Sequence, residues 1–331
     1  MVTLKDVADA AGVSMATVSR VVRGKGKVGD SCRARVQKVI DEMGYRPNLN
    51  ARALANKKAD MFGLICPNVS SPFFGSVADG VSSVAKETDH RLIMCNSQGD
   101  FTQVLKAINT LQEHGCQNII LHSHATPAQK LIELTKKIPG LVILSRNIAE
   151  ISEHCVWLNN QYGGQLWGNY LLKKGHKDFT IFVQQASNYE SYERINGLKH
   201  TLQEAGLSWS EQCVQVFEGL HNIEKLIAEL NKKGNLTKAL IAANDSVAIG
   251  LINGLKALGK RVPEDVSVIG FDDLHIFSYA CYPRLTTVKY PIAEMAAHAA
   301  RLSLRLTEKN QKIDLSANLF TPELVERNSV L

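Results

Sequence analysis

Hydrogen-bond donors that suit DNA are concentrated between residues 14 and 23 of this 331-residue chain. Arg20 can donate two parallel hydrogen bonds to O6 and N7 of guanine, a pair worth roughly 1–3 kcal/mol of discrimination between bases. The serine and threonine hydroxyls suit phosphate oxygens, and the neighbouring methionine and alanine can contact thymine methyl groups. The candidate DNA-contacting residues are Ser14, Met15, Ala16, Thr17, Ser19, Arg20 and Arg23. Lys25 and Lys27 extend this basic cluster, and a solvated loop is the alternative interpretation of these two lysines.

Three short helices are predicted to present these side chains. A capping box at Thr3 and Asp6 starts a helix that Gly12 ends, and Ser14 is a favourable N-cap for a second helix over about residues 15–22. A third, amphipathic helix carries apolar residues at helical spacing, namely Val36, Val39, Ile40 and Met43. This order predicts a helix-turn-helix unit, whose second helix enters the major groove of DNA.

The excess positive charge of the chain lies in its first sixth. Residues 1–58 hold twelve Lys and Arg against five Asp and Glu, a balance of +7. The whole chain carries +6, so the remaining residues sum to −1. A basic head on a nearly neutral body favours a polyanionic partner, and a solvated basic tail is the alternative.

The composition excludes several other classes of protein. An apolar fraction of 45% with 21% charged residues is typical of a globular protein. No window approaches the ~18 uninterrupted apolar residues of a membrane span, and the first residues lack the pattern of a secretory signal. Seven scattered cysteines without a CxxC pair are expected to be reduced. We therefore expect a cytoplasmic protein.

Short apolar runs alternate with amphipathic helical stretches from Met61 onward. The buried-strand candidates are MFGLIC, RLIMCN, QNIILH and LVILS, and after about residue 159 FTIFV, KALIAA and VSVIG. This alternation predicts an α/β body with parallel sheets and crossover helices, built in two similar halves.

Five stretches of the sequence resemble the LacI/GalR family of bacterial transcriptional regulators, most of all its galactose-repressor branch. In chain order they are KDVADAAGVSMATVSRVV, YRPNLNARALANKK, ANDSVAIG, VPEDVSVIGFDD and PRLTTVKYP. The resemblance covers nearly the whole chain. It implies a sequence-specific repressor of carbohydrate uptake or catabolism genes, whose affinity for its operator is controlled by a small molecule.

The resemblance also implies a division of the chain. The expected parts are a helix-turn-helix domain (1–46), a hinge helix (47–57) and an effector-binding and dimerisation domain (58–331). That last domain resembles the periplasmic-binding-protein fold, in which three strands join two lobes around a ligand. The expected N-lobe is about 58–158 with 289–319, and the expected C-lobe is about 159–288 with 320–331.

The hinge is expected to add a second contact with DNA. In the family pattern Asn48 and Ala51 face the DNA, and Leu54 wedges into the minor groove and kinks the duplex. A helix this short is marginal alone, so we expect it to fold only on DNA beside its dimer mate. The alternative is an ordinary linker with Leu54 packed on the body.

The resemblance places an effector site between the two lobes. Its candidate residues are Phe73, Phe74, Ser145, Arg146, Asn159, Arg194, Asn244 and Asp272. Arg194 in YERINGL and Asp272 in GFDD match effector-binding positions, and a fixed Arg and Asp can clamp neighbouring hydroxyl groups. The two phenylalanine faces suit the apolar face of a sugar, or a base. A structural ion pair or a strand-end cap is the alternative for the polar members.

A neutral hexose or a glycoside, for example one with a galactose-like hydroxyl pattern, is the expected effector. The body lacks a second strongly basic cluster for a phosphorylated ligand. The family commonly has an acidic residue where this chain has Asn159 and Asn160. We therefore expect this chain to recognise a different pattern of ligand hydroxyl groups at that position. A purine or nucleoside is the alternative, because Phe73 and Phe74 could stack on a base. No cofactor is expected, and the sign of the effector's action on DNA binding stays open.

A homodimer on a palindromic operator is the expected assembly, because two-fold symmetry in the protein mirrors that of the DNA. Tetramers of the family carry an extra leucine-rich helix after the last strand. This chain stops at LVERNSVL, so we expect a dimer.

An enzyme and a transport-type binding protein are the competing interpretations. No GxSxG or HExxH motif is present. His122 and His124 alternate as a metal pair could, but histidines at a strand end more often face solvent, so we expect no metal site. The DNA-binding head and the missing secretory signal disfavour a transport protein.

Overall fold

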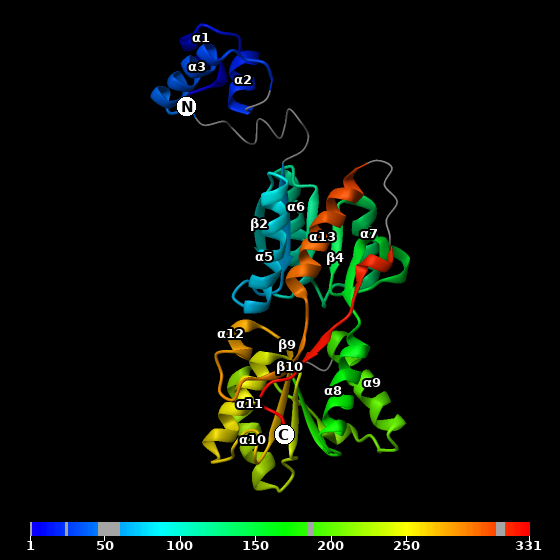
Figure 1. Cartoon of the computed structure of the whole chain (residues 1–331). Coiled ribbons are helices and arrows are strands. Elements are labelled where there is room, and N and C mark those ends of the chain that lie inside the picture. The colour runs from blue at the N-terminus through cyan, green and yellow to red at the C-terminus, as the bar shows by residue number, and fades with distance from the viewer. Residues whose placement is uncertain (1, 24–25, 46–59, 185–188, 309–314) are drawn as a thin grey trace. The chain divides into compact units, whose positions relative to one another are not determined.

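The computed structural model describes residues 2–23, 26–45, 60–184, 189–308 and 315–331. The chain divides into two compact units (Figure 1). The first, the head, contains Met1–Ala59 and the short segment Glu113–Gly115, and the second, the body, contains Asp60–Gln112 and Cys116–Leu331. The expected hinge residues Asn48, Ala51 and Leu54 lie outside the described residues, as does the side chain of Arg23.

Three helices build the described part of the head, as the sequence predicts. They are α1 (Leu4–Ala11), α2 (Met15–Arg23) and α3 (Asp30–Met43). Their buried faces form one small core of Val7, Ala8, Ala11, Val18, Val21, Val36 and Ile40. Because α2 carries only two of these side chains, its remaining surface is free to face a partner.

The helix boundaries of the head follow from local hydrogen bonds. The capping box is present, since the Thr3 amide donates to Asp6 Oδ2 at 2.8 Å and the Asp6 amide donates to Thr3 Oγ1 at 3.3 Å. Gly12 ends α1 in the left-handed region, with φ of 64°, which glycine adopts without a steric cost. Ser14 Oγ then accepts the Thr17 amide at 3.2 Å, the N-cap bond expected at the start of α2.

The first half of the body is a six-stranded sheet in the order β11-β5-β4-β3-β1-β2, with every neighbouring pair parallel. Its strands are β1 (Met61–Cys66), β2 (Arg91–Asn96), β3 (Asn118–Leu121), β4 (Leu141–Leu144), β5 (Cys155–Leu158) and β11 (Leu319–Phe320). The helices of this half are α5 (Pro72–Glu87), α6 (Phe101–Glu113), α7 (Ala128–Lys137) and α13 (Ile292–Thr307), with 3₁₀ turns η1 (Ala149–His154) and η4 (Leu315–Asn318). We call this half the N-lobe.

The second half, the C-lobe, repeats the plan with the order β12-β10-β9-β8-β6-β7. Its strands are β6 (Phe179–Val183), β7 (Val214–Val216), β8 (Ala239–Ala242), β9 (Ser267–Asp272), β10 (Thr286–Lys289) and β12 (Glu323–Val325). All neighbours are parallel except β10 and β12. The helices are α8 (Asn160–Lys173), α9 (Tyr189–Glu204), α10 (Ile223–Lys232), α11 (Asp245–Ala257) and α12 (His275–Ser278), with η2 (Glu211–Cys213) and η3 (Leu220–Asn222).

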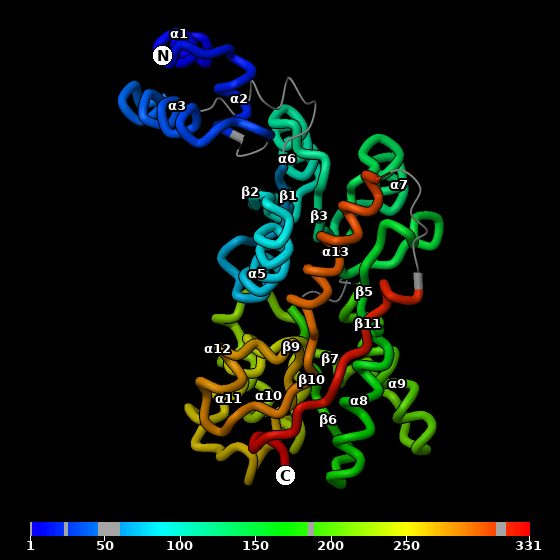
Figure 2. Tube along the Cα trace, turned by 45° about the horizontal axis from the view of Figure 1, so that its top comes forward, coloured from blue at the N-terminus to red at the C-terminus, as the bar shows by residue number. Residues whose placement is uncertain are grey.

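The chain crosses between the lobes three times (Figure 2). The crossings run from β5 to α8, from β10 to α13 and from β11 to β12. Strands β5 and β10 both leave their sheets at their carboxyl ends. Because the neighbouring strands are parallel, the carboxyl ends of both sheets face the boundary between the lobes, which is where α/β sheets of this kind bind ligands.

None of the described helices is long and apolar enough to cross a bilayer.

Candidate ligand site between the lobes and DNA-binding surface of the head

The exposed side of α2 carries most of the expected DNA-contacting residues. Met15 is 53% exposed, and Ala16 and Arg20, four residues apart on one helix face, are exposed as well. Thr17 and Ser19 are half-buried. Ser14 Oγ lies 2.9 Å from the Thr17 hydroxyl, so these two residues also stabilise the start of the helix. Met15, Ala16 and Arg20 are thus exposed together, and their contacts with bases stay a prediction.

Arg194 is a buried cation that several contacts hold in place. It is 5% exposed and lies in the second turn of α9. Its Nε donates to Asn160 Oδ1 at 2.8 Å and its Nη1 donates to the Ala243 carbonyl at 2.9 Å. The guanidinium carbon lies 3.6 Å from the centre of the Phe271 ring. These contacts from three elements hold the charge at the carboxyl end of the C-lobe sheet.

Two glycines let α9 approach α8 closely enough for these contacts. A Cβ atom on Gly164 would overlap the carbonyl oxygen of Arg194, and one on Gly197 would overlap the carbonyl of Gln161. Any side chain at either position would separate the helices. The spacing between Arg194 and Asn160 thus depends on glycine at both contact points.

Glu190 lies one helical turn before Arg194 and joins the two lobes. Its Oε1 accepts a hydrogen bond from the Tyr290 hydroxyl at 2.8 Å, and Arg194 Nη2 lies 3.7 Å away. Its Oε2 lies 3.2 Å from His124 Nε2, which belongs to the loop after β3 in the N-lobe. The Tyr290 hydroxyl also hydrogen bonds to Ser145 Oγ, at 2.7 Å, at the end of β4. A continuous polar chain therefore spans the lobe boundary.

The electrostatics of this chain keep Glu190 ionised. Burial acts to raise the pKa of Glu190, but the hydrogen bond and charge of His124, with the nearby Arg194, bring it to about 2. Burial and the Glu190 carboxylate together raise the pKa of Tyr290 well above its usual value. The boundary thus contains a charged carboxylate held by a neutral phenol, the His124 imidazole and the Arg194 guanidinium.

Asp272 is the carboxylate that the sequence analysis expected in the site, and its surroundings differ from those of Glu190. It ends β9 with φ of 107°, in a region that L residues seldom adopt. Its side chain has no hydrogen-bonding partner among the residues that the structure describes. Burial raises the pKa of Asp272 well above its usual value, although the charge of Arg194 opposes the shift. A buried carboxyl without a partner can gain from a ligand hydroxyl.

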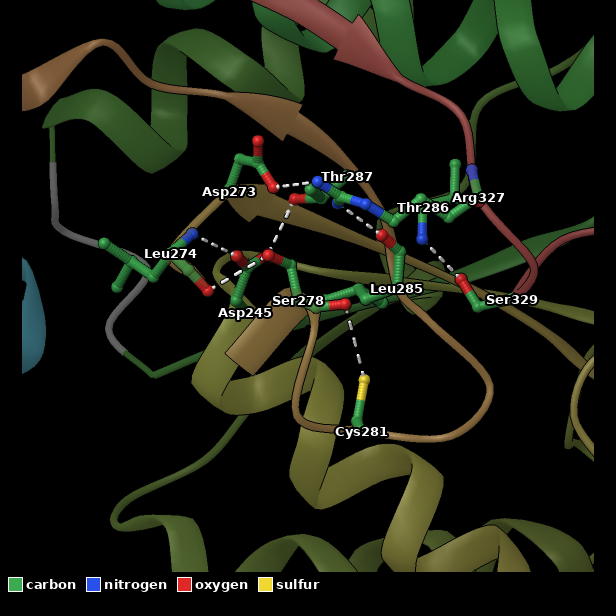
Figure 3. Close-up of polar contacts among 10 residues, drawn as sticks. All are labelled: Asp245, Asp273, Leu274, Ser278, Cys281, Leu285, Thr286, Thr287, Arg327 and Ser329. Carbon is green, nitrogen blue, oxygen red and sulfur yellow. Dashed lines mark hydrogen bonds and ion pairs between the residues drawn. The ribbon is translucent and has the colours of Figure 1, made fainter. Parts of the chain in front are cut away.

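A network beneath this site fixes the end of β9 (Figure 3). Asp245 Oδ1 accepts from the Thr287 hydroxyl at 2.6 Å, and its Oδ2 accepts from the Leu274 amide at 2.8 Å. Asp273, next to the site residue, forms an ion pair of 2.7 Å with Arg327. Burial raises the pKa of Asp245 to about 7, against the lowering effect of its hydrogen bonds.

An aromatic wall covers the N-lobe side of the site. Phe73 is half-buried, and its ring contacts those of Phe74, His122 and Tyr290 edge-on, at centroid distances of 5.2, 5.9 and 5.4 Å. Phe74 is buried and belongs to the core of the body. Phe73 is thus the aromatic residue that can meet a ligand, whereas Phe74 supports it.

Three of the expected polar residues have local structural bonds. Asn159 Oδ1 caps α8 by accepting from Tyr162 N, and Asn244 Oδ1 caps α11 by accepting from Val247 N, both at 3.0 Å. Arg146 Nη1 donates to the Thr126 carbonyl at 2.8 Å. Their roles toward a ligand stay predictions, since the hydrogen bonds described for these side chains serve the protein itself.

The structure adds residues that the sequence analysis missed. Asn160, and not its neighbour Asn159, holds Arg194. Glu190 could have been found from its spacing, because residues four apart on a helix share a face with each other. Tyr290 is the penultimate residue of the motif PRLTTVKYP, but its role depends on which strand crosses between the lobes.

Our expectation for His122 was wrong. We expected it to face solvent, and it is 2% exposed. The chain after β3 turns toward the lobe boundary, where Phe73, Phe74 and His124 enclose the ring. Burial lowers the pKa of His122 to about 3, so the ring is neutral.

Comparison with known proteins was consistent along the whole chain. Residues 3–48 match the family model "Bacterial regulatory proteins, lacI family", and residues 169–330 match a periplasmic binding protein-like domain. The HTH-type transcriptional regulator GalR of Escherichia coli is 36% identical over 331 residues, covering 100% of this chain and 96% of that protein. GalS of Salmonella typhimurium is 35% identical, covering 100% and 97%.

Solved structures show the same fold. The lac repressor dimer bound to operator and the anti-inducer ONPF has a TM-score of 0.83 at 22% identity, covering 100% of this chain and 99% of that chain. A CelR–cellobiose complex has a TM-score of 0.69 at 24% identity, covering 99% and 100%.

The helix-turn-helix head and the two-lobed α/β body define a class of DNA-binding regulators with a periplasmic-binding-protein-like body. Identity of this extent shows that the chain belongs to the lacI family of bacterial regulatory proteins. It is a DNA-binding transcriptional regulator, and its relatives are regulators and not enzymes.

Proposed function

We propose that the protein is a cytoplasmic repressor of carbohydrate uptake or catabolism genes, controlled by a neutral sugar that binds between the lobes. The observation that carries the proposal is a fixed Arg194 whose charge acts on the buried Asp272, a carboxyl without a hydrogen-bonding partner among the described residues. Hydroxyl groups of a sugar can accept from the guanidinium and donate to the carboxyl. Phe73 supplies an apolar face on the opposite side.

The ligand acts on DNA through the division of the chain into a head (1–46), a hinge (47–57) and a ligand-binding body (58–331). A ligand that changes the orientation of one lobe relative to the other changes the spacing of the two hinges in a dimer. A 10³-fold effect on operator affinity needs ~4 kcal/mol of differential ligand binding between the two states. Leu54 is the minor-groove wedge of this scheme, and Leu54→Ala should weaken operator binding and reduce DNA bending.

Exposed apolar side chains on the C-lobe support a homodimer, the assembly that a palindromic operator requires. Ile276, Tyr279 and Tyr282 are exposed on and after α12, with Tyr282 at 95%. Ile276 and Tyr282 line a pocket of about 340 Å³, to which α11 also contributes. Exposed apolar clusters of this kind mark protein interfaces. Light scattering after size exclusion should give a dimer, and Tyr282→Asp should shift it toward the monomer.

A thermal-shift screen tests the identity of the ligand. Purified protein is heated with neutral sugars, glycosides, sugar phosphates and purines. Every compound that raises the melting temperature is then tested for its effect on binding to an operator selected from random DNA. Stabilisation by a neutral sugar with altered operator affinity supports the proposal, and stabilisation by purines alone would replace the sugar with a nucleobase ligand.

A further inference from the structure

Three side chains with metal-ligating atoms converge at the lobe boundary. They are His122 and His124 from the loop after β3 and Glu190 from the first turn of α9. One nitrogen of each histidine and one carboxylate oxygen all lie within 4.8 Å of one another. The two histidines belong to the N-lobe and the glutamate to the C-lobe, so the cluster exists only where the lobes meet.

His122 is the observation that points to a missing partner. Its side chain is 2% exposed, and neither Nδ1 nor Nε2 has a hydrogen bond to any residue that the structure describes. A buried donor or acceptor left unpaired costs roughly 1–3 kcal/mol. The rings of Phe74 and His124 pack edge-on against it, with centroids 4.9 and 4.6 Å away. The open nitrogens therefore lie in an apolar enclosure beside the His124–Glu190 pair.

The donor set of the cluster is two imidazole nitrogens and one carboxylate oxygen. Zinc takes this set with bonds of about 2.0–2.2 Å and, when only three protein ligands are present, leaves a fourth position open. In a tetrahedron of that size two ligand atoms lie about 3.3 Å apart. His124 Nε2 and Glu190 Oε2 are already 3.2 Å apart. Bringing the most distant pair of atoms to that spacing requires a shift of at most about 1.5 Å, from the 4.8 Å limit of the cluster.

The surroundings of Glu190 suit the role of a metal ligand. Its Oε1 is held by Tyr290 and Arg194, which leaves Oε2 directed to the histidines. Groups that bind the outer oxygen of a metal-bound carboxylate fix its orientation. We propose that His122, His124 and Glu190 bind one Zn²⁺ ion that links the two lobes, with its fourth position open to an oxygen atom of a small molecule. This site goes beyond the sugar-binding function proposed above and does not depend on it.

The test is a titration of the full-length protein after removal of metals by a chelator. We expect isothermal titration calorimetry to find one Zn²⁺ per chain. His124→Ala and Glu190→Gln should each reduce the affinity at least 100-fold. His200→Ala is the matched control, because His200 lies on α9 with Glu190, is half-exposed and pairs with Glu204 outside the cluster. Circular dichroism and melting curves without metal show whether each variant is folded.

Spectroscopy identifies the ligands independently of the variants. Co²⁺ in the site should give the visible absorption of a four-coordinate ion with nitrogen and oxygen ligands, and zinc-edge absorption spectra should show two imidazoles. The seven cysteines are free thiols, so a thiolate charge-transfer band would instead place the metal on cysteine. That band, an absence of stoichiometric binding, or full binding by His124→Ala would each overturn the proposal.

Discussion

At the scale of single residues, the two neighbouring aspartates at the end of β9 have different tasks. The side chain of Asp272 has no hydrogen-bonding partner among the described residues, whereas that of Asp273 forms an ion pair with Arg327. Both residues have a positive φ, 107° for Asp272 and 54° for Asp273. One is available to a ligand and the other stabilises the lobe.

The substitution Asp272→Asn should therefore weaken ligand binding by about 10- to 100-fold, the loss of one charge-assisted hydrogen bond. Stability should be unchanged or higher, because a buried carboxyl without a partner is removed. Asp273→Asn is the matched control and should lower the melting temperature while leaving ligand affinity within a few-fold. Calorimetric titration of both variants with the sugar found by screening measures this. Equal ligand affinity in Asp272→Asn and the wild type would remove Asp272 from the site.

Asp245 gives the protein a pH-dependent stability. Its pKa is about 7 in the folded protein and 3.8 in the unfolded chain, with burial as the main cause. Because the folded state binds the proton more tightly, this contribution to the free energy of unfolding is complete below about pH 4 and is lost as the pH rises to about 7. We expect the wild type to lose about 2–3 kcal/mol of stability from this group between pH 5 and pH 8.

Asp245→Asn should remove most of that loss, because the amide does not ionise. Denaturant unfolding at a series of pH values measures it, with Asp79→Asn, an exposed aspartate on α5, as the control. A variant whose stability falls with pH as steeply as the wild type would show that another group is responsible.

At the scale of elements, the ligand site depends on how α8 and α9 pack. Gly164 and Gly197 stand where the two backbones touch, and Glu190, Arg194 and Asn160 lie on the same helices. Gly164→Ala should press the helices apart, cost about 1–3 kcal/mol or more, and lower ligand affinity by displacing Arg194.

Gly75→Ala is the control for this prediction, because a Cβ there meets nothing within 4 Å. It should be neutral or slightly stabilising in the first turn of α5. Thermal unfolding together with ligand titration separates the two cases. If Gly164→Ala bound ligand as the wild type does, the close packing of α8 and α9 would not be what positions the arginine.

Some strands could be predicted from the sequence and others could not. Long apolar runs such as MFGLIC and FTIFV predict β1 and β6 correctly, because a strand buried on both faces is apolar throughout. Short strands such as β11, with two residues, and β12, with three, have too few side chains to form a pattern. Their positions depend on pairing with distant strands, β5 and β10.

The same limit applies to the site. Arg194 and Asp272 could be predicted because family motifs surround them. His124 and Tyr290 meet Glu190 only after the chain has crossed between the lobes, and no local pattern of residues encodes that meeting.

At the scale of the whole molecule, the charge of the chain divides as the function requires. The basic residues of the first 58 positions suit a polyanion, whereas the body sums to −1. The body is joined across its lobes by hydrogen bonds of Tyr290 to Ser145 and Glu190 and by the His124–Glu190 ion pair. A ligand that inserts among these groups must exchange its own contacts for them. Ligand binding is in this way linked to the orientation of the two lobes relative to each other.

The most direct test of the account is operator binding by the full-length protein, measured by fluorescence anisotropy with and without the sugar that stabilises it. If the sugar controls DNA binding from the lobe boundary, it should change the operator affinity of the wild type at least tenfold. Asp272→Asn should bind the operator as the wild type does without sugar and should respond to the sugar only at much higher concentrations. A sugar that binds the wild type tightly and leaves its operator affinity unchanged would contradict control of DNA binding from the lobe boundary.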